Sequence, residues 1–257
     1  MRLSNEIRAV LASVAIDGEQ TQQRVFALMV SAVLRPEQSR PFGVADWSYD
    51  LPLEKRWVYD ALTYVGLTRV VNRLAGWTRL KPYLLKILSH YTDHAERLFD
   101  AGMPPVQLLW SHWIMLLAER ELGYRADRQL LGQMWWRAFY WQSDAGHLHE
   151  LDGRVYDGYC ALHAAYNSAK TLGDAAMLAQ VRRAACWYAG NAQSGLPTEE
   201  PWGLAAFAFF DETRAFAERQ LHDVRADLRL APALSNNRLS FGVGLLADAA
   251  MTLEDTQ

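Results

Sequence analysis

Polar side chains with acid–base potential share one face of a helix predicted over residues 155–172. Five of them recur at intervals of three or four residues: Tyr156, Cys160, His163, Asn167 and Lys170. A phenol, an imidazole, an amide and an ammonium on one face could hold a polar ligand or act as an acid–base pair. If this face is a site, His163 should be reachable from a cleft, with Tyr156 or Asn167 within hydrogen-bonding distance. The alternative is a solvated outer face, although Cys160 and Tyr156 argue against full exposure.

The segment before this helix has the densest group of titratable residues: His147, His149, Glu150, Asp152 and Asp157. A His-x-His pair with nearby carboxylates can bind a divalent metal. The pair nevertheless lies in a predicted loop, and no complementary His or Cys pair accompanies it. We therefore predict a polar loop with helix-capping acids, and no metal or cofactor. His147 and His149 stay candidates for ligand binding.

Two further candidates lie on other elements. His112 is in a helix predicted from Pro104 to Leu122, which is apolar nearly all round and therefore central and buried. Such a histidine either bonds a backbone carbonyl or faces a wet cavity. Glu200 follows another glutamate and precedes Trp202, and paired carboxylates beside an aromatic ring are typical of glycan-processing clefts. Glutamates in the first turn of a helix are also favoured by the helix dipole, without any catalytic role.

Aromatic residues are abundant, with ten Trp and eleven Tyr in the chain. Five aromatics between residues 133 and 141 span more than one helical face: Trp135, Trp136, Phe139, Tyr140 and Trp141. Because one buried stripe cannot hold them all, some must reach a surface, a cavity or a partner. We expect Trp136 or Tyr140 to be partly exposed.

The elements that position these residues are predicted to be helices from end to end, because no stretch shows the alternation of a strand. Short connections between the helices predict antiparallel neighbours, and hence an array of αα-hairpins in an all-α fold without a sheet. The array would form an open solenoid or a closed α/α ring of nine to eleven helices. Residues 1–257 are interpreted as a single domain with an N-terminal helical arm (1–35) and an ordered crossing loop (36–52).

Two joints between predicted helices resemble those of a known enzyme class. The Gly173-Asp174 turn and the loop 191–197 before Glu199-Glu200-Pro201-Trp202 loosely resemble hairpin joints of α/α-toroid enzymes. The resemblance implies a ring of hairpins around a cleft.

Composition excludes several classes of function. A net charge of −3 provides no overall field for nucleic acid or an anionic membrane, and no apolar run is long enough to cross a bilayer. The N-terminus lacks an uninterrupted apolar segment, so we expect a cytoplasmic protein whose two cysteines are reduced. The chain has no Gly-rich phosphate loop, dinucleotide-binding fingerprint, Gly-x-Ser-x-Gly or Cys-x-x-Cys motif.

Two hypotheses about function follow. In the first, this is a helical-hairpin adaptor, chaperone or immunity-type inhibitor that binds a protein partner through an aromatic-rich surface, because Trp, Tyr and Arg are enriched in binding hot spots. That surface would include Trp136, Tyr140 and Trp202, with His147, His149, Tyr156, Asn167 and Lys170 as further binding residues. In the second, it is a small α/α enzyme acting on a carbohydrate or another small polar ligand, with His163, His112 and Glu200 as catalytic residues that converge on one pocket.

Overall fold

The computed structural model describes residues 2–14, 21–35, 57–74, 76–99, 104–140, 155–191, 200–230 and 237–255. Within these ranges the regular structure is entirely helical, with eleven α-helices and two short 3-10 helices and no strand, which confirms the predicted all-α class. The first half contains α1 (Arg2–Ala12), α2 (Thr21–Leu34), α3 (Trp57–Val70), η3 (Thr78–Leu80), α4 (Lys81–Phe99), α5 (Pro105–Leu122) and α6 (Arg128–Tyr140). The second half contains α7 (Val155–Leu172), α8 (Ala175–Asn191), α10 (Leu204–Phe209), η4 (Asp211–Thr213), α11 (Arg214–Leu230) and α12 (Asn237–Glu254).

Local signals in the sequence explain where several helices begin and end. Pro104 precedes α5 and Pro105 occupies its first turn, where a missing N–H costs nothing. The helix ends at Gly123, whose φ of 77° is left-handed and whose N–H donates to the carbonyl of Ala118. Asp174 caps α8, because its carboxylate accepts from the backbone N–H groups of the next turn.

Other helix boundaries also bear on what the sequence predicts. A helix from Ser4 to about Leu34 is predicted with a possible break at Asp17-Gly18. The helices α1 and α2 lie on either side of that position, and residues 15–20 themselves lie outside the described residues.

The sequence also predicts a helix over residues 198–210, because Thr198 resembles an N-cap. From residue 200 onward the structure has only the short helix α10 in this range, because Gly203 has a φ of 68° and turns the chain just before Leu204. Asp211 predicts the N-cap of a helix that runs to about Leu228, but in the structure it begins the 3-10 turn η4 and α11 starts at Arg214.

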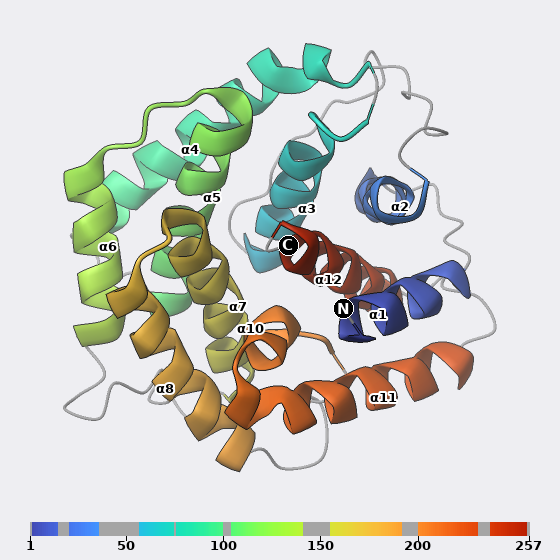
Figure 1. The fold of residues 1–257 in the computed structure, drawn as a ribbon. Coiled ribbons are helices and arrows are strands. Elements are labelled where there is room, and N and C mark those ends of the chain that lie inside the picture. Colours follow the sequence, from blue (N-terminus) through green and yellow to red (C-terminus); the bar gives the residue numbers. More distant parts are fainter. Residues whose placement is uncertain are drawn as a thin grey trace.

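The helix α5 lies at the centre of one half of the molecule. It contacts α3, α4, α6 and α7, and most of its residues are buried, which confirms its predicted central position. In the other half, α12 is surrounded by α1, α2, α3 and α10 (Figure 1). Since α3 contacts both α5 and α12, it connects the two halves.

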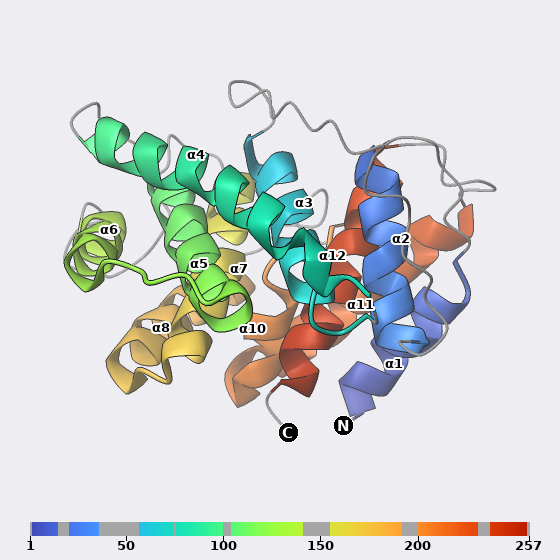
Figure 2. The same cartoon turned by 90° about the horizontal axis from the view of Figure 1, so that it is seen from above.

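The first and last described helices lie side by side (Figures 1 and 2), and Arg8 Nη2 is 2.6 Å from Glu254 Oε1 across them. The expected arm, residues 1–35, contributes α1 and α2, which both contact α12. The crossing loop 36–52 lies outside the described residues. None of the helices in the described ranges is long and apolar enough to cross a membrane.

Candidate functional site

His163 lies on α7 and is enclosed by three tryptophan rings. The ring of Trp110 stacks on it with centroids 5.7 Å apart and an interplanar angle of 9°. Trp113 and Trp202 approach it edge-on, at 5.6 and 5.7 Å. Only 1% of His163 is exposed, so the prediction that it faces a solvent-accessible cleft is wrong. The physical reason is that His163 contacts Trp110 and Trp113 of α5 and Asp248 of α12 instead of solvent.

The hydrogen bonds of His163 assign its tautomer. The backbone N–H of Gly203 donates to Nδ1 at 3.4 Å, so Nδ1 is the acceptor nitrogen. Nε2 lies 3.0 Å from Oδ2 of Asp248 on α12 and therefore carries the proton that it donates to that carboxylate. Both ring nitrogens are satisfied, and the imidazole serves to connect α7, α12 and the turn at Gly203.

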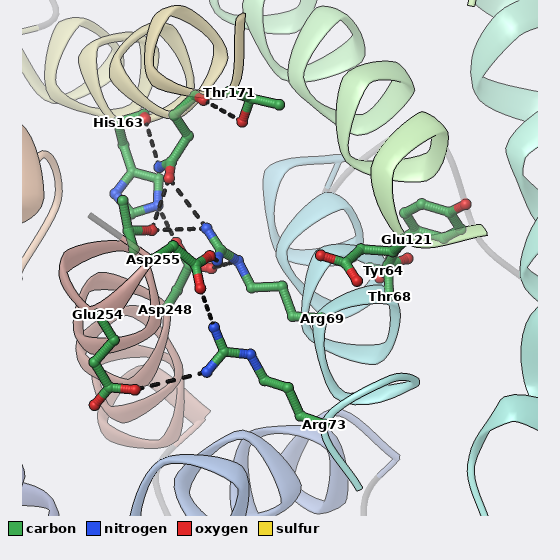
Figure 3. Close-up of polar contacts among 12 residues, drawn as sticks. Tyr64, Thr68, Arg69, Arg73, Glu121, His163, Thr171, Asp248, Glu254 and Asp255 are labelled. Carbon is green, nitrogen blue, oxygen red and sulfur yellow. Dashed lines mark hydrogen bonds and ion pairs between the residues drawn. The ribbon is translucent and has the colours of Figure 1, made fainter. Parts of the chain in front are cut away.

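A buried ion pair lies beside this histidine (Figure 3). Arg69 of α3 places Nε 2.6 Å from Oδ1 of Asp248, and both side chains are almost completely buried. Burial alone would raise the pKa of Asp248, but the charge of Arg69 and the hydrogen bond from His163 outweigh it and hold that pKa below its ordinary value. Burial lowers the pKa of Arg69 while Asp248 opposes the shift, and the guanidinium stays charged.

The remaining donors of Arg69 are also used. Its Nη2 donates to Oδ1 of Asn167 at 3.1 Å and to Oγ1 of Thr252 at 2.7 Å, and Nη1 is 3.3 Å from Oδ2 of Asp255. Asn167 in turn donates to the carbonyl of His163 at 2.9 Å. We call these residues, with Asp248, the polar core cluster. Its bonds join α3, α7 and α12, so the alternative of a solvated outer face is also wrong for His163 and Asn167.

Glu200 and Trp202 are connected to this cluster through aromatic contact. Glu200 is 5% exposed, its Oε2 accepts from Nε1 of Trp202 at 2.9 Å, and the Trp202 ring touches His163. Gln220 of α11 donates to the carbonyls of both residues, at 2.9 Å each. Glu200 therefore stabilises the turn before α10. The sequence did not indicate this role of Glu200.

His112 contacts a different helix from the ones that surround His163. It is buried on α5, and its ring lies 5.5 Å from that of Trp135 on α6. Burial, with a smaller effect of the Arg128 charge, lowers its pKa to about 3, so the imidazole is neutral. Trp202 thus contacts both His163 and Glu200, whereas the ring of His112 packs against Trp135 on α6.

The predicted binding residues divide into buried, half-buried, exposed and undescribed ones. Trp202 and Asn167 are buried, so the prediction that Trp202 belongs to an exposed aromatic-rich surface is wrong. Trp136 is 60% exposed on α6, which confirms the expectation for this residue. Lys170 is half-buried at the end of α7, with Nζ 4.6 Å from the centre of the Phe209 ring. The side chains of Tyr140 and Tyr156, and the residues His147 and His149, lie outside the described part of the chain.

A groove that sequence reasoning did not predict lies between α8 and α10. Its volume is about 930 Å³, and its walls are mainly apolar, with Leu178, Trp187, Phe209 and Phe210 among them. Phe209 is 39% exposed and is one of three large hydrophobic residues found exposed in the described ranges. We call this cavity the α8/α10 groove.

The charged side chains that line the α8/α10 groove are both cationic: Arg182 and Arg183. Arg182 pairs with Glu212 of η4, and this pair is more than two-fifths exposed on each side. Arg183 makes no ion pair with any residue that the structure describes. Burial raises the pKa of Cys186, which also lines the groove, so this thiol stays protonated. The groove is therefore an apolar cavity with positive charge at its rim.

A metal centre has no basis in this part of the molecule. Among the described residues no three His, Cys, Asp or Glu side chains are grouped closely enough to hold a metal ion. The segment 147–152, which carries the predicted polar loop, lies outside these residues. Comparisons with protein-family models, curated proteins and solved structures find no match to this chain.

Proposed function

We propose that this protein binds a partner protein, and that a segment of the partner occupies the α8/α10 groove. The observation that carries the proposal is a cavity of about 930 Å³ with apolar walls, an exposed Phe209 and two arginines. Binding sites in proteins are concave and mostly apolar, with a few polar groups that fix orientation. Aromatic residues and arginine also contribute most of the energy at protein interfaces.

The exposed Trp136 supports a second contact between the partner protein and this chain, on α6. This contact would belong to the aromatic-rich surface that the proposal assigns to partner binding. Trp135, its neighbour, donates from Nε1 to Oε1 of Gln180 on α8 at 2.7 Å, so α6 and α8 are directly connected. A partner that fills the α8/α10 groove would thus bind near a helix that presents an exposed indole. Its role would be that of an adaptor, chaperone or immunity-type inhibitor.

The enzyme alternative has less support. His163, His112 and Glu200 are nearly fully buried, and the hydrogen bonds of His163 and Glu200 have structural partners. A general acid or base must reach the proton that it transfers. A small polar ligand could reach His163 only if the tryptophans around it moved apart.

Two further parts of the proposal concern architecture and location. We propose a stacked array of αα-hairpins, solenoid-like or toroid-like, which is supported by contacts between consecutive helices from α1 to α6. We also propose a cytoplasmic location, which is supported by two cysteines that are not joined in a disulfide.

Site-specific photo-crosslinking tests the proposed function. A benzophenone amino acid replaces exposed Ala179, which lines the α8/α10 groove, or exposed Arg225 on α11 as the control. In an extract of the native host, we expect a protein adduct from position 179 that disappears in the Leu178→Asp background. Circular dichroism of the Leu178→Asp variant is compared with wild type to check that it is folded. Equal adducts from both positions, or none from position 179, would contradict the proposal.

A further inference from the structure

Resting on the proposed function, we infer that the segment bound in the α8/α10 groove is acidic as well as apolar. Its apolar side chains would fill the cavity against Leu178, Trp187 and Phe209, while two of its carboxylates pair with Arg182 and Arg183. The ligand is thus an amphipathic peptide segment of a partner protein that carries at least two acidic residues.

The apolar component follows from the walls of the α8/α10 groove. The ring of Phe209 packs at 5.5 Å from Tyr166 of α7 and remains partly exposed on its other side. Trp187 is only half-buried and contacts Tyr188 edge-on at 5.1 Å. Apolar surface that stays open to water in this way is stabilised when a partner covers it. The volume is near the upper end for ligand pockets, so several side chains can enter.

The acidic component follows from the charges around the α8/α10 groove. Arg183 is exposed and makes no ion pair within the described ranges, and Lys170 lies over the Phe209 ring. Two acids near the α8/α10 groove are paired with arginines, Glu212 with Arg182 and Asp211 with Arg214, and the carboxylate of Asp174 accepts from backbone N–H groups at the start of α8. A chain with a net charge of −3 therefore presents a locally positive groove, which favours a negatively charged ligand.

The spacing of the two arginines distinguishes a peptide from a ligand with one carboxylate. Adjacent residues on a helix point about 100° apart, so Arg182 and Arg183 reach different points of the rim. A fatty acid has one carboxylate and could satisfy one of them. A peptide segment can place two carboxylates at separate positions while its apolar side chains enter between them.

Arg182 provides an exchangeable contact. Its ion pair with Glu212 is exposed on both sides, with 55% and 45% of the two side chains accessible. Exposed pairs contribute little to stability, so a carboxylate of the partner can replace or join Glu212 at low cost. Arg183 would supply most of the charge selectivity, because it has no such internal competitor among the described residues.

Fluorescence anisotropy with defined peptides tests the inference. The probes are capped, fluorescein-labelled peptides of leucine and glutamate, with glutamine and lysine analogues in which every glutamate is replaced. They are titrated with the wild-type chain, Arg183→Glu, and the matched control Arg225→Glu, which reverses an exposed charge outside the groove lining. We expect the glutamate peptide to bind about tenfold more tightly than the glutamine peptide, with the preference falling at high salt.

Charge reversal gives the sharpest outcome. Arg183→Glu should lower the affinity for the glutamate peptide by about tenfold and raise the affinity for the lysine peptide. Arg225→Glu should leave both affinities within about twofold of wild type. The inference is overturned if the glutamine peptide binds as tightly, or if no peptide binds. It is also overturned if dodecanoate displaces the peptide at lower concentration than the unlabelled peptide does, or if sedimentation shows a dimer that Arg183→Glu dissociates. If the adduct at position 179 persists after any of these results, only the acidic peptide is excluded and the proposed function stands.

Discussion

Replacing His112 by Phe should make the stability of this fold less sensitive to acid. The folded-state pKa of His112 is about 3, against an ordinary value of 6.5, because the ring is buried beside Trp135. Its Nδ1 has no hydrogen-bond partner among the described residues. The unfolded chain therefore binds a proton at this position from about pH 6.5 downward, whereas the folded chain does not until about pH 3. The stability that neutral His112 provides is complete above pH 6.5 and is lost progressively as the pH falls toward 3.

The size of the effect follows from this difference. At pH 5 the unfolded-state pKa lies about 1.5 units above the solution pH, which corresponds to about 2 kcal/mol of lost stability. Near pH 7.5 His112 is almost unprotonated in the unfolded chain as well, so it lowers the stability by almost nothing. The phenyl ring of the variant has no proton to gain, so its stability relative to wild type should improve by about 2 kcal/mol between pH 7.5 and 5.

Urea denaturation of the two proteins at both pH values measures this difference. His222→Gln is the control, because it removes an exposed histidine on α11. It separates the effect of removing a buried histidine from the effect of removing any histidine. Any packing strain caused by Phe shifts stability equally at both pH values and cancels. If wild type and His112→Phe changed in parallel, within about 0.5 kcal/mol, the reasoning from burial would be refuted.

Three other substitutions test the packing of the fold by the same denaturation measurement. Asp248→Asn should destabilise the protein by about 3 kcal/mol, because it leaves the Arg69 charge buried and poorly compensated. The double variant Arg69→Met, Asp248→Leu should recover most of that loss of stability. Equal stability of the single and double variants would contradict the ion-pair argument. Gly158→Ala should cost about 1–3 kcal/mol, because the added methyl would collide with the ring and hydroxyl of Tyr188, and a neutral result would contradict this packing. Gly132→Ala has open space around the new methyl on the exposed side of α6, so it should raise stability by up to about 1 kcal/mol, and a loss would contradict that assignment.

Helix class and several helix ends could be predicted because they depend on neighbouring residues. Proline in the first turn of α5, Gly123 after it and the Asp174 cap act through bonds within one or two turns. The central position of α5 followed from apolar residues all round its surface. The shortening of α10 could not be read in the same way, since it depends on Gly203 turning beneath the buried His163.

The structure brings His163 and Asn167 of the predicted polar face into one cluster, but their environment differs from the predicted one. Whether His163 meets solvent or Asp248 depends on the position of α12, which no local pattern specifies. A signal was nevertheless present. Arg69 and Asp248 are single charged residues within long apolar runs, and such residues are seldom buried without an opposite charge nearby. Two apolar runs, one with a single basic residue and one with a single acidic residue, predict a buried ion pair between those residues.

The α8/α10 groove lay beyond sequence reasoning because two elements form it together. Leu178 and Trp187 lie off the buried stripe of α8, which runs through Met177, Val181, Ala184 and Tyr188. An apolar residue off the main stripe is by itself ordinary at a protein surface. Only the approach of Phe209 converts these residues into one cavity.

The most direct test of the central claim is the amide hydrogen-exchange footprint of the partner captured at position 179. Exchange is measured on the free chain and on the complex. We predict slower exchange over residues 175–187 of α8 and 204–213 of α10 and η4, with no change in α1 and α2. Protection confined to other helices, with exchange in α8 and α10 unchanged, would contradict the α8/α10 groove as the binding site.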